Sequence, residues 1–112
     1  MATWTKAELA AKVLEYVGVV PAGQSAAAED STLVESVIDS VHDQLDSEQL
    51  VPFATSAIPT WAQWPLVKYL AVEVGPAFGK PFPEQLKMRA RQELERSSAG
   101  YRHPIEGKTR YF

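Results

Sequence analysis

The 112-residue chain contains no cysteine. Disulfide bonds, thiolate nucleophiles and thiolate metal sites are therefore excluded, and packing must stabilise the fold. A membrane-spanning run is also missing, because the most apolar stretch, residues 61–78, holds two charged residues and two prolines and is shorter than the roughly 20 apolar residues that a span needs. No basic segment followed by an apolar one opens the chain, so we expect no targeting signal.

Signatures of catalysis are equally scarce. The chain has no G-x-S-x-G turn, no phosphate-binding glycine loop and no H-E-x-x-H motif. The nearest pattern is a histidine among carboxylates at helical spacing, as metal sites and acid/base pairs require: Asp39, His42, Asp43 and Asp46. A solvated acidic helix face is the commoner meaning of such a pattern. We expect no enzyme, no catalytic residue, no metal and no cofactor, and a weak hydrolase that uses this helix is a rival hypothesis.

Composition and periodicity predict one small helical domain. Hydrophobic residues make up 46% of the chain and charged residues 22%, which is typical of a globular protein. A chain of this length forms one core and buries roughly two thirds of its extended surface. Apolar residues recur at spacings of three and four in several segments. We predict an all-α fold, a small bundle of about four helices over residues 1–98, followed by an extended C-terminal arm over residues 99–112.

Local signals predict where the first two helices begin and end. Thr5 and Glu8 have the spacing of a capping box, and Gly18 is placed to end the first helix in the left-handed conformation. Ser25 or Asp30 is expected to cap the second helix, which runs to about residue 47.

The central helix, expected within residues 60–78, is apolar on nearly every face. Such a helix lies in the middle of a core when it does not lie in a membrane. Because a chain this short has few other elements to cover it, we expect part of its surface to meet another copy or a partner. Trp61 and Trp64 are expected to take part in core or interface packing.

The connection before that helix, residues 48–60, contains two prolines and several apolar residues. A loop of this kind either packs back on the core or contacts another chain. Val51, Phe53 and Ile58 are therefore candidates for contacts with another chain.

Charge divides the chain into two unlike halves. Residues 1–64 carry two bases and nine acids, a net charge of −7, whereas residues 65–112 carry nine bases and five acids, a net charge of +4. The halves can pair within one molecule, or the acidic face of one copy can meet the basic face of the next.

Basic residues of the fourth helix, expected over residues 84–98, also permit a nucleic-acid interpretation. Lys87, Arg89, Arg91 and Arg96 carry it, although Glu93 and Glu95 interrupt the patch. The last fourteen residues combine aromatic and basic side chains, the types that dominate interfaces. They favour docking of the arm on a partner, through Tyr101, Arg102, His103, Pro104, Ile105, Lys108, Arg110, Tyr111 and Phe112.

The order of these parts resembles the head-to-tail adaptor (connector) proteins of tailed bacteriophages. Thr5 to Leu9 leading into Val17 to Val19, an acid-capped helix with Val37 to Asp39, a tryptophan-containing third helix, a basic fourth helix and a Pro/Arg/Tyr tail carry the resemblance. The chain is most similar in pattern to the tail accessory factor of short-tailed phages.

The resemblance implies a structural virion protein in the neck, assembled in the host bacterial cytoplasm. It implies a homo-oligomeric ring, a dodecamer, between the portal protein and a downstream tail protein, with double-stranded DNA passing through without sequence recognition and no membrane partner. The C-terminal arm would then grip the portal. The alternative is a small helical nucleic-acid-binding or DNA-packaging accessory protein.

Overall fold

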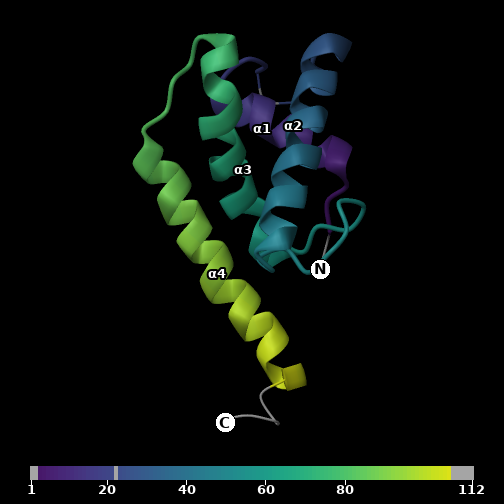
Figure 1. Ribbon diagram of the computed structural model, residues 1–112. Coiled ribbons are helices and arrows are strands. Elements are labelled where there is room, and N and C mark those ends of the chain that lie inside the picture. The colour runs from purple at the N-terminus through teal and green to yellow at the C-terminus, as the bar shows by residue number, and fades with distance from the viewer. Residues whose placement is uncertain (1–2, 22, 107–112) are drawn as a thin grey trace.

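The computed structural model describes residues 3–21 and 23–106, with side chains placed as far as Ser98 (Figure 1). The predicted all-α fold is confirmed: the described residues form four α-helices and one 3-10 helix, without a strand. The elements are α1 (Lys6–Val17), α2 (Ala28–Ser47), α3 (Thr60–Val74), η1 (Gly75–Phe78) and α4 (Glu84–Glu106).

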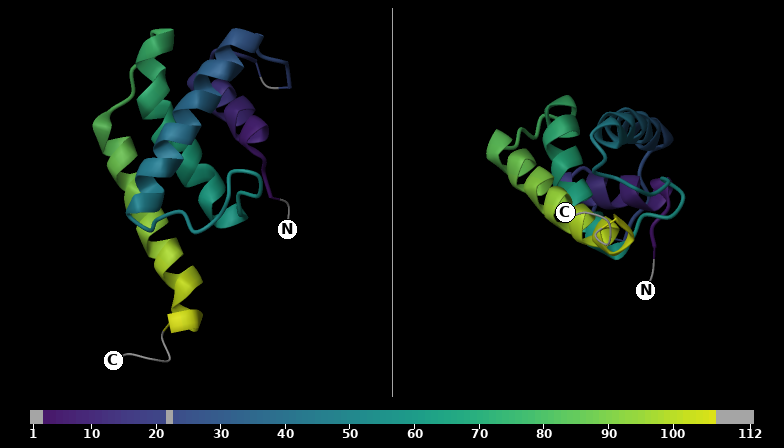
Figure 2. Two further views of the ribbon diagram at one scale, coloured as in Figure 1. Left: turned by 45° about the vertical axis from the view of Figure 1, so that its right-hand side comes forward. Right: turned by 60° about the horizontal axis from the view of Figure 1, so that its bottom comes forward.

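The third helix is the centre of the bundle. α1, α2 and α4 all pack against α3, and α1 also packs against α2. Figures 1 and 2 show α2 and α4 on opposite sides of α3. The lower half of α4 continues beyond the other helices in the same views. The bundle therefore leaves one side of α2 and one side of α4 facing outward.

Both ends of α1 form as the sequence predicts. The Thr5 hydroxyl accepts from the Glu8 N–H, and the Glu8 carboxylate accepts from the Thr5 N–H at 2.8 Å, which completes the capping box. Gly18 has φ 93° and closes the helix, its N–H donating to Glu15 and Leu14 carbonyls. These local signals set where the helix begins and ends, and its buried stripe packs on α2 and α3.

The start of α2 differs from both predicted caps. The helix begins at Ala28, and its N-cap residue, Ala27, provides no side-chain hydrogen bond. Glu29 and Asp30 instead lie in the first turn, where their charge interacts favourably with the positive end of the helix dipole. The helix ends at Ser47, as predicted.

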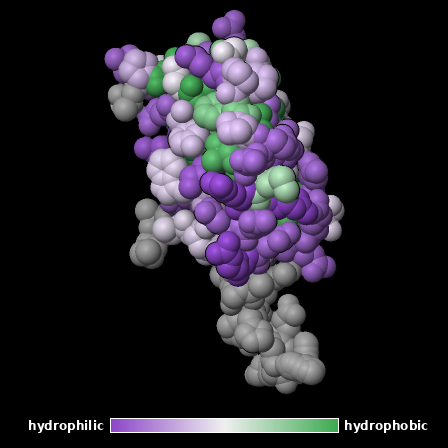
Figure 3. All heavy atoms as spheres, turned by 90° about the vertical axis from the view of Figure 1, so that its left-hand side faces the viewer, coloured by the Kyte–Doolittle hydropathy of each residue, from purple (hydrophilic) through white to green (hydrophobic). Residues whose placement is uncertain are grey.

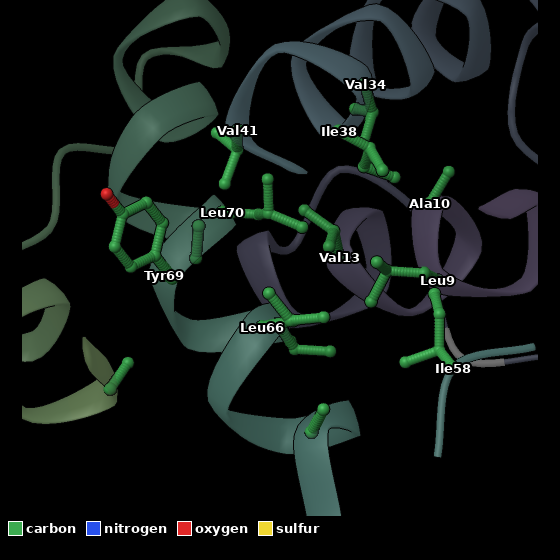
Figure 4. Packing of buried hydrophobic residues seen from close by; sticks show 14 of the residues in the cluster. Leu9, Ala10, Val13, Val34, Ile38, Val41, Ile58, Leu66, Tyr69 and Leu70 are labelled. Carbon is green, nitrogen blue, oxygen red and sulfur yellow. The ribbon is translucent and has the colours of Figure 1, made fainter. Parts of the chain in front are cut away.

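The central helix is covered by its own chain more completely than expected. Nine of the 15 residues of α3 are buried, because three other helices surround it. Figure 4 shows Leu70 of α3 and Val13 of α1 pointing toward each other, with Leu9 beside Ile58. The large exception is Trp64, whose surface is 50% exposed. A single copy thus hides most of the apolar surface of α3 and leaves one tryptophan half uncovered.

The connection between α2 and α3 packs back on the core, the first of its two predicted arrangements. Leu50, Val51 and Ile58 are buried. Ile58 also pairs with Trp4 through two backbone hydrogen bonds of 3.0 and 2.8 Å, an isolated antiparallel bridge. The bridge ties the residues before α1 to the residues before α3.

The fourth helix is longer than predicted. It continues past Ser98 to Glu106, so residues 99–106, expected to begin an extended arm, are helical. The helix contains both Gly100 and Pro104, which disfavour a helix interior by about 1 and about 3 kcal/mol relative to alanine. Residues 107–112 lie outside the described residues, and the arm is not tested there.

Candidate interaction surfaces

Asp39 and His42 of the acidic cluster of α2 have separate partners. Asp39 pairs with Lys6 of α1, with both carboxylate oxygens 3.2 Å from Nζ. His42 turns toward the loop, where its Nε2 donates to the Phe53 carbonyl at 2.7 Å. Among the residues that the structure describes, no group of three or more histidines and carboxylates is placed to hold a metal ion. His42 therefore fastens the loop to α2.

A small apolar pocket lies beneath the same loop. Its volume of about 10 Å³ is room for about one water molecule. Apart from His42 and Thr55, its walls are aliphatic or aromatic: Leu9, Ile38, Val41, Phe53, Ile58, Leu66 and Leu70. A space of this size is too small for a substrate molecule.

The three predicted contact residues of the loop lie inside the chain's own core or against it. Val51 and Ile58 are each 1% exposed, so their side chains are not available to a partner while the domain is folded. Phe53 is half-buried and makes edge contacts with the rings of His42 and Trp61, at 5.9 and 5.6 Å between centroids. The sequence marked this loop as apolar, and its apolar residues serve the fold.

Two tryptophans form an aromatic surface at the start of α3. The rings of Trp4 and Trp64 meet edge to face, with 5.8 Å between centroids. Trp4 is half-buried, whereas Trp64 is half exposed. Tryptophan is among the residues most enriched at protein interfaces. Trp64 was expected to take part in core or interface packing, but its contact with Trp4, 60 residues away in the sequence, depends on the fold.

A second group of partly exposed apolar residues lies where the end of α1 meets the connection that precedes α4. Tyr16 near the end of α1 is 39% exposed and stacks on Phe82, with 5.8 Å between ring centroids. Figure 3 shows hydrophobic residues in the upper part of the face on the α4 side, with hydrophilic residues over most of the rest. The sequence analysis did not identify Tyr16, because it lies beside the apolar stripe of its helix.

Ion pairs fasten α4 to the bundle. Lys87 lies 2.5 Å from a Glu73 carboxylate oxygen and 5.2 Å from the centre of the Tyr69 ring. Arg91 pairs with Glu48, the C-cap residue directly after α2. The hydrogen bond to Glu73 raises the pKa of Lys87, and burial raises the pKa of the Tyr69 hydroxyl. Two of the four predicted basic residues of α4 are therefore engaged within the chain.

Acids and bases both remain exposed on the surface of the bundle. In the described part of the chain, Arg89 and Arg96 of α4 have no ion-pair partner, and both are exposed. They lie seven residues apart, two turns of helix, and so share one side of α4, with Glu93 between them. The acids of α2 without an ion pair are Glu29, Asp30, Glu35, Asp43 and Asp46.

The predicted arm residues divide between helix and undescribed chain. The backbone of Tyr101, Arg102, His103, Pro104 and Ile105 belongs to the last part of α4. Lys108, Arg110, Tyr111 and Phe112 lie outside the described residues.

Comparison with known proteins gives no relative. No protein-family model matches the chain, and no curated protein or solved structure matches it either. Within residues 3–21 and 23–106, every helix is too short or too polar to cross a bilayer.

Proposed function

We propose that this chain is a structural virion protein, a head-to-tail adaptor that forms a ring between the portal and the tail, through which DNA passes. The sequence resemblance suggests the class, and the all-α bundle is the architecture that the resemblance implies. The observation that carries the proposal is the shape of α4. Among the residues whose side chains the structure describes, the last buried one is Ser98, and the backbone of α4 continues past the other helices to Glu106.

We expect the end of a helix that extends beyond the other helices to be available for contact with another molecule. The sequence from Tyr101 onward is rich in aromatic and basic residues, which are the usual anchors of protein interfaces. In the proposed adaptor, this end of the chain grips the portal. The aromatic surface of Trp4 and Trp64 is then available to a neighbouring subunit or to the downstream tail protein.

Two truncations test the arm. Removal of residues 107–112 leaves α4 whole, and removal of residues 99–112 also removes its projecting end while keeping every buried residue that the structure describes. We expect both shortened chains to stay helical by circular dichroism. The longer deletion should abolish capture by the portal protein of the same phage in a pull-down assay. Normal portal binding by that truncated chain contradicts the arm assignment.

The position in the particle tests the function itself. Electron microscopy of purified particles, with the protein labelled, should place the label at the head-tail junction. Label elsewhere in the particle, or none at all, contradicts an adaptor.

A nucleic-acid-binding or packaging accessory protein is the second candidate, favoured by the exposed and unpaired Arg89 and Arg96. Phosphate binding depends steeply on salt, because it releases counterions. A salt-sensitive gel shift with double-stranded DNA that is lost in Arg89→Ala/Arg96→Ala supports this candidate. An adaptor that only lets DNA pass should give no retained complex.

A further inference from the structure

The connection before α4 carries two prolines at the surface. Pro81 and Pro83 are exposed, whereas Phe82 between them is half-buried and stacks on Tyr16 of α1, with 5.8 Å between ring centroids. Proline fixes its own φ and biases the residue before it toward extended backbone. Residues 80–83, here called the proline segment, therefore favour a polyproline II conformation. The Phe82 ring anchors this segment and leaves both prolines uncovered.

The aromatic surface of Trp4 and Trp64 is of the kind that binds such a segment. Extended proline-containing segments dock on exposed aromatic rings, because their stiff backbone loses little conformational entropy on binding. Trp64 is 50% exposed, and its ring meets the half-buried Trp4 ring edge to face. The two indole rings thus offer a proline an apolar platform that the bundle leaves partly uncovered.

The proline segment and the aromatic surface lie at opposite ends of α1. Trp4 precedes this helix and contacts Trp64, whereas Tyr16 lies in its last turn and contacts Phe82. Trp4 and Tyr16 are 12 residues apart, which corresponds to about 18 Å of helix. Because Phe82 is held against Tyr16, the prolines of one molecule cannot reach its own tryptophans. A contact between the two surfaces therefore needs a second copy.

The charges beside the two surfaces are complementary. Lys68 lies one turn of α3 after Trp64 and on the same side of the helix. It has no ion-pair partner within the described residues. Glu84 directly follows Pro83, its side chain is 69% exposed, and it makes only a long approach of 3.7 Å to Lys87. A base without a partner beside the tryptophans can thus meet an exposed acid beside the prolines.

A second pair of unlike charges adjoins the same surfaces. The Glu8 carboxylate accepts a hydrogen bond of 2.8 Å from the Thr5 N–H, which places this acid beside Trp4. Lys80 directly precedes Pro81 and is exposed. Each surface therefore carries one acid and one base, and the two surfaces do not repel each other as two like-charged surfaces would.

We propose that the proline segment of one copy docks on Trp4 and Trp64 of a second copy of this chain. Glu84 of the first copy then lies beside Lys68 of the second. Such a contact joins unlike surfaces, so its repetition gives a ring or a filament, unless two copies exchange it reciprocally and close a dimer. The inference deepens the proposed function and rests on it, because a ring of identical subunits needs a contact between unlike surfaces.

Removal of either surface tests the contact. In sedimentation velocity at up to about 1 mM protein, since a small interface binds weakly, we expect the wild-type chain to self-associate. Trp64→Ala and Pro81→Ser/Pro83→Ser should each associate at least about tenfold more weakly, as expected for the central residues of an interface. Met88→Ala and Pro21→Ser, at exposed positions outside both surfaces, are the matched controls and should associate like the wild type. Circular dichroism should show all four variants folded.

Exchange of the two charges supplies a second comparison. Lys68→Glu and Glu84→Lys should each weaken association about fivefold, because like charges then meet. A chain with both substitutions again pairs opposite charges and should recover. Arg96→Glu and Asp43→Lys make the same two changes of net charge at other exposed positions and should leave association unchanged.

Three results overturn the contact. They are a wild-type chain that stays monomeric, a tryptophan or proline variant that associates as well as the wild type, and a double charge variant that fails to recover. Association that is lost in Trp64→Ala but kept in the proline variant falls under the second result and gives the aromatic surface a different occupant.

The proposed function fails in a different way. A chain that associates through this contact but stops at a dimer, or is absent from the head-tail junction, contradicts the adaptor and not the contact. A ring at that junction whose subunits meet through other surfaces contradicts the contact alone.

Discussion

The two long connections of the bundle are both rich in proline and apolar residues, yet they are held in different ways. Residues 48–59, between α2 and α3, bury Ile58 and also form hydrogen bonds with other elements: the bridge to Trp4, the bond from His42 and a bond of 3.2 Å from Gln63 to the Ile58 carbonyl. Residues 75–83, between α3 and α4, form a bond within the connection, from the Lys80 N–H to the Gly75 carbonyl at 2.9 Å, and approach themselves closely at Gly75. The first connection is held by contacts with other elements, and the second by contacts within itself.

The largest expected effect on stability is at Ile58, where the connection of residues 48–59 enters the core. Ile58→Ala removes a side chain that is 1% exposed, and large-to-small changes of this kind cost about 2–5 kcal/mol in the free energy of unfolding. Urea unfolding followed by circular dichroism measures it. Ser56→Ala, at an exposed position of the same connection, is the matched control, and an equal loss in both variants would show that Ile58 is not a core residue.

The connection of residues 75–83 should instead be destabilised by adding a side-chain atom at Gly75. A Cβ at Gly75 would lie 2.2 Å from the Lys80 carbonyl oxygen and 2.8 Å from the Phe82 ring. Gly75 has ordinary helical φ and ψ, so an unobstructed alanine would stabilise the helix by about 0.5–1 kcal/mol. We expect Gly75→Ala to destabilise by about 1–3 kcal/mol or more.

Gly79 offers the control for that substitution. Its φ is 72°, and no atom lies within 4 Å of an added Cβ, so Gly79→Ala should cost about 1–2 kcal/mol through backbone conformation alone. If Gly75→Ala stabilised the protein, the close approach of residues 80–82 to α3 would be wrong.

Loss of the hydrogen bond from His42 to Phe53 should destabilise the connection of residues 48–59 by less. His42→Leu keeps the apolar contact with Phe53 but leaves the Phe53 carbonyl without its donor, at a cost of about 1–3 kcal/mol. Hydrogen exchange should show faster opening of residues 50–58. Asp43→Leu, one position along the same helix and exposed, should leave the exchange unchanged.

The smallest expected effect is a loss of stability at high pH. It involves Lys87 of α4 and Tyr69 of α3. Lys87 and Tyr69 both have raised pKa values, so the folded protein keeps protons that the unfolded chain loses above pH about 10. The stability that these two groups contribute should therefore be fully present at neutral pH and below, and should be lost as the pH rises above about 10 and through their folded-state pKa values.

The double variant Tyr69→Phe/Lys87→Met should lack this additional alkaline loss while being less stable at pH 7 by up to about 1 kcal/mol, the usual contribution of a partly exposed ion pair. Lys68→Met serves as the control and should keep the wild-type pH dependence. An alkaline loss as steep in the double variant as in the wild type would assign the effect to other groups.

Most of the fold was predictable from local patterns, as α1 illustrates. Its capping box, its apolar stripe and Gly18 all act within a few residues of one another, and all three are confirmed. In α2, the end at Ser47 was predicted correctly, but the predicted caps were wrong, because Ala27 precedes the first turn and no local side chain is required there.

The surfaces were less predictable, because they depend on which residues the fold covers. Composition identified residues 51–58 as apolar, and only the packing decides that Val51 and Ile58 face inward. The split between acidic and basic halves was visible in sequence, whereas the ion pairs that remove Lys87 and Arg91 from the basic patch arise from contacts between distant elements. The predicted end of the fourth helix near residue 98 was wrong, because the helix continues through Gly100 and Pro104 to Glu106.

The unequal exposure of the three tryptophans makes the chain its own spectroscopic probe. Trp61 lies half-buried beside Phe53, whereas Trp64 stands half in solvent against Trp4. A soluble quencher added to the unlabelled protein should reach Trp64 first. Any molecule that settles over that ring would shield its emission and shift it to shorter wavelength, so recruitment at this end of α3 can be followed in a cuvette without attaching a dye.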